Sequence, residues 1–197
     1  MIHHKQPQSG FALLMTLLVV GAVVSITLAV IELTIKQLNL TVTARDSEIA
    51  FHAANAGLEC ARYVRRIAST TFEVVGTPLD TIDFECFNRT QELELVSNGG
   101  LSVSGNGELR RYLGEVTWGT GDRCSVVDML IMIVPDTETS DLEISNLHTL
   151  YQGFPQGDTK TCSPGARCTV AQVIGYNRGC TDTGLAGTVR REILLEF

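Results

Sequence analysis

An uncharged apolar segment near the N-terminus constrains this chain more than any other feature. Residues 11–31 read FALLMTLLVVGAVVSITLAVI, a run of 21 residues without an ionisable side chain. At about 1.5 Å per residue a helix of that length is roughly 30 Å long, which matches the hydrocarbon core of a bilayer. We therefore expect the N-terminal part of the chain to be inserted in a membrane.

The segment does not have the pattern of a cleaved secretory signal. Such a signal has an apolar core of roughly 7–15 residues followed by a cleavage site of small residues. Here the core is longer, no A-x-A-like site follows it, and the stretch after Glu32 contains no proline and a single glycine before Gly76. The sequence predicts one uninterrupted helix from Phe11 to about Ala68.

Beyond residue 68 the pattern changes to strands and turns. Clusters of Gly, Pro, Asn, Asp and Ser separate runs rich in β-branched and aromatic residues. We expect about six strands, at Asp83–Phe87, Leu93–Ser97, Tyr112–Trp118, Val126–Val134, Cys168–Tyr176 and Val189–Phe197. Residues 127–134, VDMLIMIV, are almost continuously apolar and suit a central strand packed on the helix. The predicted fold class is α+β, a long N-terminal helix packed on an antiparallel sheet.

All six cysteines lie beyond the apolar segment, at Cys60, Cys86, Cys124, Cys162, Cys168 and Cys180. An even number in a compact extracytoplasmic domain indicates disulfides, whose pairing the sequence does not fix. Zinc is the rival interpretation, but no tight C-x-x-C or paired-His spacing occurs. We expect disulfides and no metal, and a bridge from Cys60 would tie the helix to the rest of the domain.

Charge is distributed unevenly along the chain. Residues 69–197 hold nine Lys and Arg against eighteen Asp and Glu, a net charge of −9, whereas the first 68 residues carry +2. An acidic head repels nucleic acid. The basic pairs Arg110-Arg111 and Arg190-Arg191 are interpreted as solvated strand positions, so no nucleic-acid partner is expected.

The polar leader ending in Gly10-Phe11, the apolar span and the continuous helix together resemble the N-terminus of type IV pilin-like proteins. This resemblance covers roughly the first 68 residues. It implies that a prepilin peptidase removes the class III leader MIHHKQPQSG between Gly10 and Phe11, and that Phe11 is then methylated. Residues 50–63, AFHAANAGLECARY, are similar to the corresponding helix of PilX-like minor pilins, as, more weakly, are the segments at residues 174–180 and 189–197.

Residue spacing assigns the faces of the helix, and the resemblance implies its partners. Small or apolar residues recur at steps of three and four, the spacing of one helix face, which we expect to contact the sheet: Ala50, Ala53, Ala54, Gly57, Leu58, Ala61, Val64 and Ala68. The opposite side is expected to be solvated or to face a fibre and carries Asp46, Glu48, Asn55, Glu59, Arg62, Arg65 and Arg66. The implied partners are other pilin subunits, a prepilin peptidase and an inner-membrane assembly platform, with the motor ATPase on another protein because no G-x-x-x-x-G-K motif occurs.

One position departs from the pattern of major pilins. Their mature chain carries a glutamate as its fifth residue, and counting from Phe11 that position is Met15. An intramembrane carboxylate is costly and is retained for a partner, which in pilins is the terminal amine of a neighbouring subunit. GspK-like tip pseudopilins also lack it, so the resemblance implies a tip or initiating subunit. A minor pilin within the shaft, or another anchored protein in which Met15 is simply apolar, are the alternatives.

Orientation follows from a small positive excess. Lys5 and the α-amine, with His3 and His4 nearby, favour a cytoplasmic N-terminus.

In the last predicted strand Arg191 interrupts the apolar face, so we expect it either near a strand end or paired with a buried acid. The expected organisation is a leader at residues 1–10, a transmembrane half-helix at 11–31, an amphipathic half-helix at 32–68 and a disulfide-containing head at 69–197. The protein would be a single-pass cytoplasmic membrane protein until it enters a cell-surface pilus.

Enzymatic chemistry has little support in the sequence. Outside the leader the histidines are His52 on the helix and His148, and no G-x-S-x-G motif accompanies them. No catalytic residue and no cofactor are expected. The residues of 135–143 that could ligate calcium are Asp136, Glu138, Asp141 and Glu143, but the segment lacks the glycine and spacing of a known loop and is interpreted as a solvated acidic turn.

We therefore expect a minor pilin or pseudopilin subunit with a mechanical and adhesive role and no enzymatic activity. The alternative is a membrane-anchored extracytoplasmic domain, a sensor or a hydrolase, that stays in the bilayer. A gene neighbourhood with a prepilin peptidase and an assembly ATPase would favour the pilin interpretation.

Overall fold

The structure is a computed structural model that describes residues 9–72, 76–135, 137–166 and 168–197. The chain divides into two units, residues 1–45 and residues 46–197. Helix α1, Ser9–Ile67, runs without interruption through the boundary between them. Residues 1–8, which contain Lys5 and both leader histidines, lie outside the described part.

The first unit consists of the N-terminal part of α1. Its large apolar side chains are exposed from Phe11 to Val42, and the helix is long and apolar enough to cross a membrane. The hydroxyls of Ser25 and Thr27, within the apolar segment, donate to the carbonyls of Gly21 and Val23 at 2.8 and 2.7 Å. These bonds satisfy polar groups that an apolar environment would otherwise penalise.

The second unit is built on a six-stranded antiparallel sheet with the order β1-β2-β4-β5-β8-β9. Its strands are β1 Thr81–Cys86, β2 Arg89–Val96, β4 Glu108–Trp118, β5 Arg123–Ile133, β8 Cys168–Tyr176 and β9 Arg190–Glu196. All six predicted strands are present within a few residues of their expected bounds. The apolar run in β5 occupies an interior strand, as predicted, and the α+β class is confirmed.

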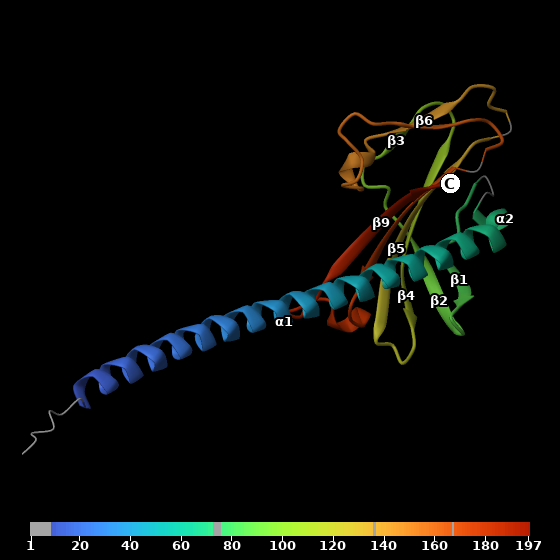
Figure 1. The fold of residues 1–197 in the computed structure, drawn as a ribbon. Helices are drawn as coiled ribbons and strands as arrows, with labels where there is room; N and C mark the ends of the chain where they lie inside the picture. The colour runs from blue at the N-terminus through green and yellow to red at the C-terminus, as the bar shows by residue number, and fades with distance from the viewer. Residues whose placement is uncertain (1–8, 73–75, 136, 167) are drawn as a thin grey trace, which may run out of the picture. The chain divides into compact units, whose positions relative to one another are not determined.

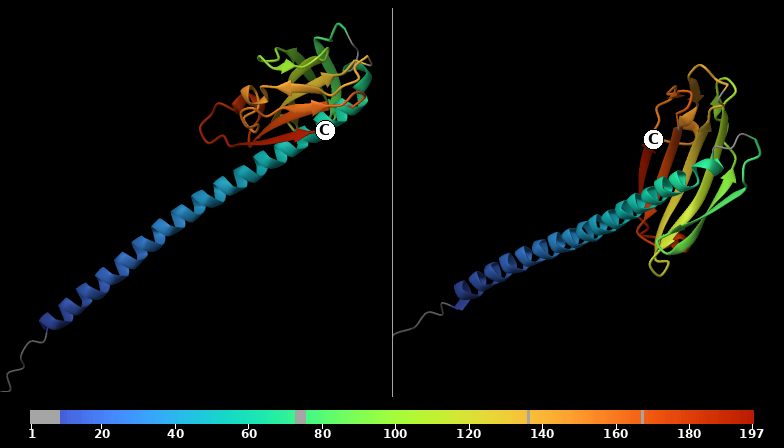
Figure 2. Two further views of the ribbon diagram at one scale, coloured as in Figure 1. Left: turned by 90° about the horizontal axis from the view of Figure 1, so that it is seen from above. Right: turned by 90° about the vertical axis from the view of Figure 1, so that its right-hand side faces the viewer.

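The part of α1 that starts at Asp46 crosses one face of this sheet (Figures 1 and 2). The predicted stripe from Ala50 to Val64 is buried there, and its part from Leu58 onward shares a core with β-strand residues such as Tyr112, Met129 and Val173. At Gly175 in β8 an added Cβ would lie 2.1 Å from the main-chain nitrogen of Ala54. Only glycine permits this approach, and the residues that α1 places there, Ala50, Ala53 and Ala54, are correspondingly small.

A second layer covers part of the sheet face that α1 does not contact. It lies at the end of the sheet away from the turn that joins β4 and β5 (Figure 1). It contains a small sheet of β3 Ser102–Val103, β6 Leu142–Ser145 and β7 Lys160–Cys162, none of which the sequence predicted. The 3₁₀ helices η1, Leu147–Thr149, and η2, Cys180–Asp182, and the four-residue helix α2, Ser69–Phe72, complete the described elements. Leu130 and Met132 of β5 pack in a second core with Leu142, Ile144, Leu147 and Tyr151.

The expectation that Arg65 lies on the solvated side of α1 is wrong. Arg65 is 5% exposed, and its Nε donates to the Thr169 hydroxyl at 2.9 Å. Its guanidinium carbon lies 5.7 Å from the centre of the Phe72 ring. Position 65 follows Val64 directly, so it lies at the margin of the buried stripe, where β8 supplies an acceptor that the helical pattern alone does not reveal.

Candidate functional site

The processing junction implied by the resemblance lies at the start of α1. Gly10 and Phe11 are helical, Phe11 is 71% exposed, and a Cβ added at Gly10 would meet no atom within 4 Å. Packing among the described residues therefore does not require glycine at position 10. Met15 is exposed on the same helix.

All six cysteines, each within the described residues, form disulfides. Cys60 pairs with Cys86 and ties α1 to β1, which confirms the expected link between helix and head. Cys124 pairs with Cys180 and joins β5 to η2, while Cys162 and Cys168 close the short turn between β7 and β8. Three disulfides in one small domain indicate an oxidising, extracytoplasmic environment for the head.

The interpretation of Arg110 and Arg111 as solvated positions is wrong. Arg110 is 2% exposed and pairs with Glu108, and it also donates to the carbonyls of Phe72 and Gly76 at 3.3 and 3.1 Å. These bonds fasten the end of α2 and Gly76 to the sheet. Arg190 and Arg191 are exposed as expected, and Arg191, at the start of β9, donates to the Ser47 hydroxyl at 2.7 Å.

Arg111 belongs to a polar cluster between the sheet and the second layer. Its Nε donates to both carboxylate oxygens of Asp128, at 2.9 and 3.1 Å, and the Tyr151 hydroxyl donates to Asp128 Oδ1 at 3.2 Å. Burial, together with the nearby Asp128 charge, raises the pKa of Tyr151 above its usual value. The hydrogen bond to Asp128 raises the pKa of Arg111. The three groups satisfy one another, which is typical of a structural cluster.

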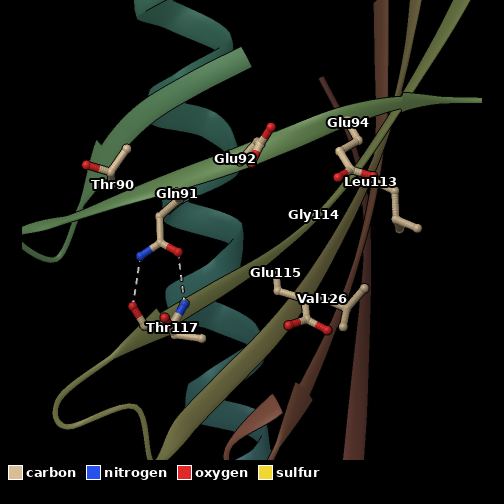
Figure 3. Close-up of a pocket in the computed structure, with 9 residues that line it drawn as sticks. All are labelled: Thr90, Gln91, Glu92, Glu94, Leu113, Gly114, Glu115, Thr117 and Val126. Atoms are coloured by element: carbon tan, nitrogen blue, oxygen red, sulfur yellow. Dashed lines mark hydrogen bonds between the residues drawn. The ribbon is translucent and has the colours of Figure 1, made fainter. Parts of the chain in front are cut away.

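A hollow of about 520 Å³ opens on the sheet where β2 and β4 separate (Figure 3). Regular pairing of these strands covers three residue pairs, from Glu94 with Leu113 to Val96 with Arg111. Beyond them the Gln91 side chain bridges the strands, since its Nε2 donates to the Thr117 carbonyl at 2.8 Å and its Oε1 accepts from the Thr117 N–H at 3.2 Å. The lining residues are Thr90, Gln91, Glu92, Glu94, Leu113, Gly114, Glu115, Thr117 and Val126.

The exposed side of the hollow is acidic. Glu92, Glu94 and Glu115 are exposed, and no ion pair to them is found among the described residues. On the adjoining strand Asp83 stands directly opposite Glu92, an arrangement of like charges that disfavours pairing. The lining contains no His, Cys, Lys or Arg. The hollow thus offers hydrogen-bond acceptors but no pairing of a nucleophile with a base.

The acidic segment at residues 135–143 is described in part. Asp136 lies outside the described residues, Glu138 Oε1 accepts from the Asn106 side chain at 2.7 Å, and Asp141 and Glu143 are exposed. Within the described ranges no three His, Cys, Asp or Glu side chains group closely enough to hold a metal ion. Glu138 therefore links two loops.

The two histidines beyond the leader lie on different elements. His52 is exposed on α1, with Nε2 at 3.7 Å from Glu48 Oε1, and His148 is in η1. The Nδ1 atom of His148 is buried and has no hydrogen-bond partner in the part of the chain that the structure describes. Among the described residues, no hydrogen bond joins a serine hydroxyl or a cysteine sulfur to either histidine.

Comparison with known proteins yields no relative: no protein-family model matches the chain, and neither curated proteins nor solved structures include a significantly similar one.

Two features of the head were not predicted from the sequence. The bridge from Gln91 to Thr117 joins residues 26 apart, and the cluster of Arg111, Asp128 and Tyr151 joins three separate segments. Tyr151 was detectable only as an aromatic residue in a turn-rich region.

Proposed function

We propose that this protein is a minor pilin or pseudopilin subunit of a type IV pilus-like fibre, and that its role is structural. One observation carries the proposal: α1 is unbroken from Ser9 to Ile67, apolar over a membrane-spanning length, and packed through its small-residue stripe on an antiparallel sheet. A fibre subunit needs this design because one helix must serve first as an anchor and then as a contact to neighbouring subunits.

The disulfides support the same function. Cys60 fastens α1 to β1, so a force applied to the helix is carried to the head by a covalent bond as well as by packing. The two other bridges close loops on the sheet. We propose that the head is extracytoplasmic and that the chain passes from the cytoplasmic membrane into a cell-surface fibre.

Gly10 provides the test. We expect replacement of Gly10 by leucine to leave the leader attached and to abolish incorporation into fibres, because the peptidase requires a small residue before the cleaved bond. Since the site around Gly10 is open, the substitution does not disturb packing. The control is Gly21→Leu, which lies on the same helix in equally open space and should be cleaved normally. Normal fibre incorporation of the Gly10→Leu protein would contradict the proposal.

Met15 leads us to propose a position at the fibre tip or in initiation. Deletion of the protein should then reduce the number of fibres more than their length, and immunogold label should lie at fibre ends. Met15→Glu should not improve assembly, because an intramembrane carboxylate costs about 2.5–3.5 kcal/mol unless an amine is within reach. Label spread evenly along the shaft would instead place the subunit within it.

A further inference from the structure

A cavity of about 340 Å³ lies at the C-terminal end of α1. Arg62, Arg65 and Arg66 line it together with Thr169 of β8 and Phe197. The arginines are spaced at i, i+3 and i+4, so they lie on one side of the helix, where like charges repel. The helix dipole favours cations in the last turn, but it does not account for their arrangement around a cavity.

One wall of this cavity is held rigidly. Arg65 is only 5% exposed, its Nε donates to the Thr169 hydroxyl at 2.9 Å, and its guanidinium lies against the Phe72 ring. Thr169 is itself fixed, since its main-chain N–H and carbonyl pair with those of Phe197 at 2.7 and 3.0 Å. A group that binds against this wall therefore orders few additional side chains, which lowers the entropic cost of binding.

The side chains around the cavity present hydrogen-bond donors. The Thr169 hydroxyl accepts from Arg65 and retains its own proton as a donor. Arg62 pairs with Glu59 at 2.7 Å, but the two side chains are 42% and 69% exposed, and such solvent-exposed pairs are weak. Arg66 is exposed and has no ion pair among the described residues. The Phe197 main-chain oxygen at this wall is engaged by the Thr169 N–H. An anionic ligand complements these cationic donors best, and planar guanidinium groups match a carboxylate well.

Exposed apolar side chains that follow the cavity arginines along α1, together with Phe197 in the lining, favour a protein ligand over a free anion. Tyr63 and Ile67 each follow one of the cavity arginines along α1 and are 48% and 52% exposed, and Phe197 is 39% exposed. Arginine next to an exposed aromatic residue is typical of the centre of protein interfaces. An inorganic anion would leave this apolar surface uncovered.

We propose that this cavity is a docking site for a neighbouring fibre subunit, which inserts an Asp or Glu carboxylate between Arg62, Arg66 and Thr169 and covers Tyr63 and Ile67 with an apolar side chain. The inference rests on the proposed fibre function. It places an intersubunit contact on the head-proximal end of α1, in addition to contacts made by the apolar segment.

The test uses the full chain in cells that assemble fibres, with a photoreactive phenylalanine analogue at Tyr63. Irradiation should crosslink it to a fibre subunit, at a segment that mass spectrometry identifies as containing Asp or Glu. Arg66→Gln should lower the crosslinking yield by about tenfold or more. Arg190→Gln is the matched control, since Arg190 is another exposed arginine outside the cavity, and it should leave the yield unchanged. Both variants should unfold at the same temperature as the unmodified protein.

Charge exchange sharpens the test. Arg66→Glu should abolish the crosslink, and replacing the identified partner carboxylate by arginine should restore it. Three outcomes would each overturn the inference. The probe at Tyr63 could crosslink to lipid alone, or Arg66→Gln could leave the crosslinking yield unchanged. The cavity could also bind inorganic phosphate while the probe forms no crosslink to any protein. A second probe at Leu18 separates the two proposals. Crosslinks from Leu18 to fibre subunits without any from Tyr63 would remove the docking site and leave the fibre function intact.

Discussion

The side-chain amide of Gln91 and the main chain of Thr117 are joined by two hydrogen bonds, so that a side chain takes the place of a peptide group between β2 and β4. Gln91 is 5% exposed, and its amide nitrogen also lies 3.4 Å from the Cys86 carbonyl. The bridge holds the edge hairpin on the sheet where the backbones have separated, with the Cys60–Cys86 disulfide next to it.

Replacing Gln91 by leucine should lower the free energy of unfolding by about 1–3 kcal/mol, because the Thr117 N–H and carbonyl lose their partners in a poorly solvated place. Urea denaturation followed by circular dichroism measures the change. Thr90→Ala is the control, since Thr90 is exposed on the same strand and its loss should change the stability by less than about 0.5 kcal/mol. Equal midpoints for the Gln91→Leu and unmodified proteins would show that the bridge does not stabilise the sheet.

The contact of α1 with the sheet depends on Gly57. An added Cβ there would lie 2.6 Å from Ser125 Cβ and 2.8 Å from Val173 Cγ1. Gly57→Ala should destabilise the head by roughly 1–3 kcal/mol through overpacking, although alanine is the better helix former by about 1 kcal/mol. Gly21→Ala, on the same helix with nothing within 4 Å, should not lower the midpoint of head unfolding. A head stabilised by Gly57→Ala would mean that helix and sheet are packed less closely than described.

Tyr151 should make stability fall at alkaline pH. Its pKa is raised by burial and by the Asp128 charge, so folding favours the protonated phenol. The resulting stabilisation is complete below the unfolded pKa of about 10 and is lost as the pH rises toward the folded pKa, at up to about 1.4 kcal/mol per pH unit. The difference between the unfolding free energies at pH 9 and pH 11 should be smaller in Tyr151→Phe than in the unmodified protein. Tyr112, whose pKa burial also raises, leaves part of the slope in place.

The disulfide pairs can be read directly by peptide mapping without reduction. The map should show Cys60 with Cys86, Cys124 with Cys180 and Cys162 with Cys168, and no alkylated thiol. Removing the Cys124–Cys180 bridge with paired serines should cost about 2–5 kcal/mol of stability. The shorter Cys162–Cys168 loop should contribute less under the same chain-entropy argument. Other pairs, or alkylation before reduction, would contradict this framework.

The sequence predicted the main elements because each has a period that one segment displays alone. The apolar run after Phe11, the helical stripe from Ala50 to Val64 and the apolar strand at residues 127–134 need no knowledge of their neighbours. The strands β3, β6 and β7 were missed because they span two to four residues each and carry no such period.

The errors concern side chains whose surroundings come from distant segments. Arg65, Arg110 and Arg111 looked solvated because charged residues usually are. Each is instead held by a group remote in sequence: the Thr169 hydroxyl, the Phe72 carbonyl and the Asp128 carboxylate. The disulfide pairing has the same character, since spacing along the chain does not determine which cysteines meet.

The most direct test of the fibre-subunit proposal is the mass of the mature N-terminal peptide, isolated from cells that assemble fibres. We predict a peptide that begins at Phe11, lacks residues 1–10 and carries one additional methyl group on the terminal amine. A peptide that still begins at Met1, in cells whose other fibre subunits are cleaved and methylated, would contradict the account and favour a permanently anchored membrane protein.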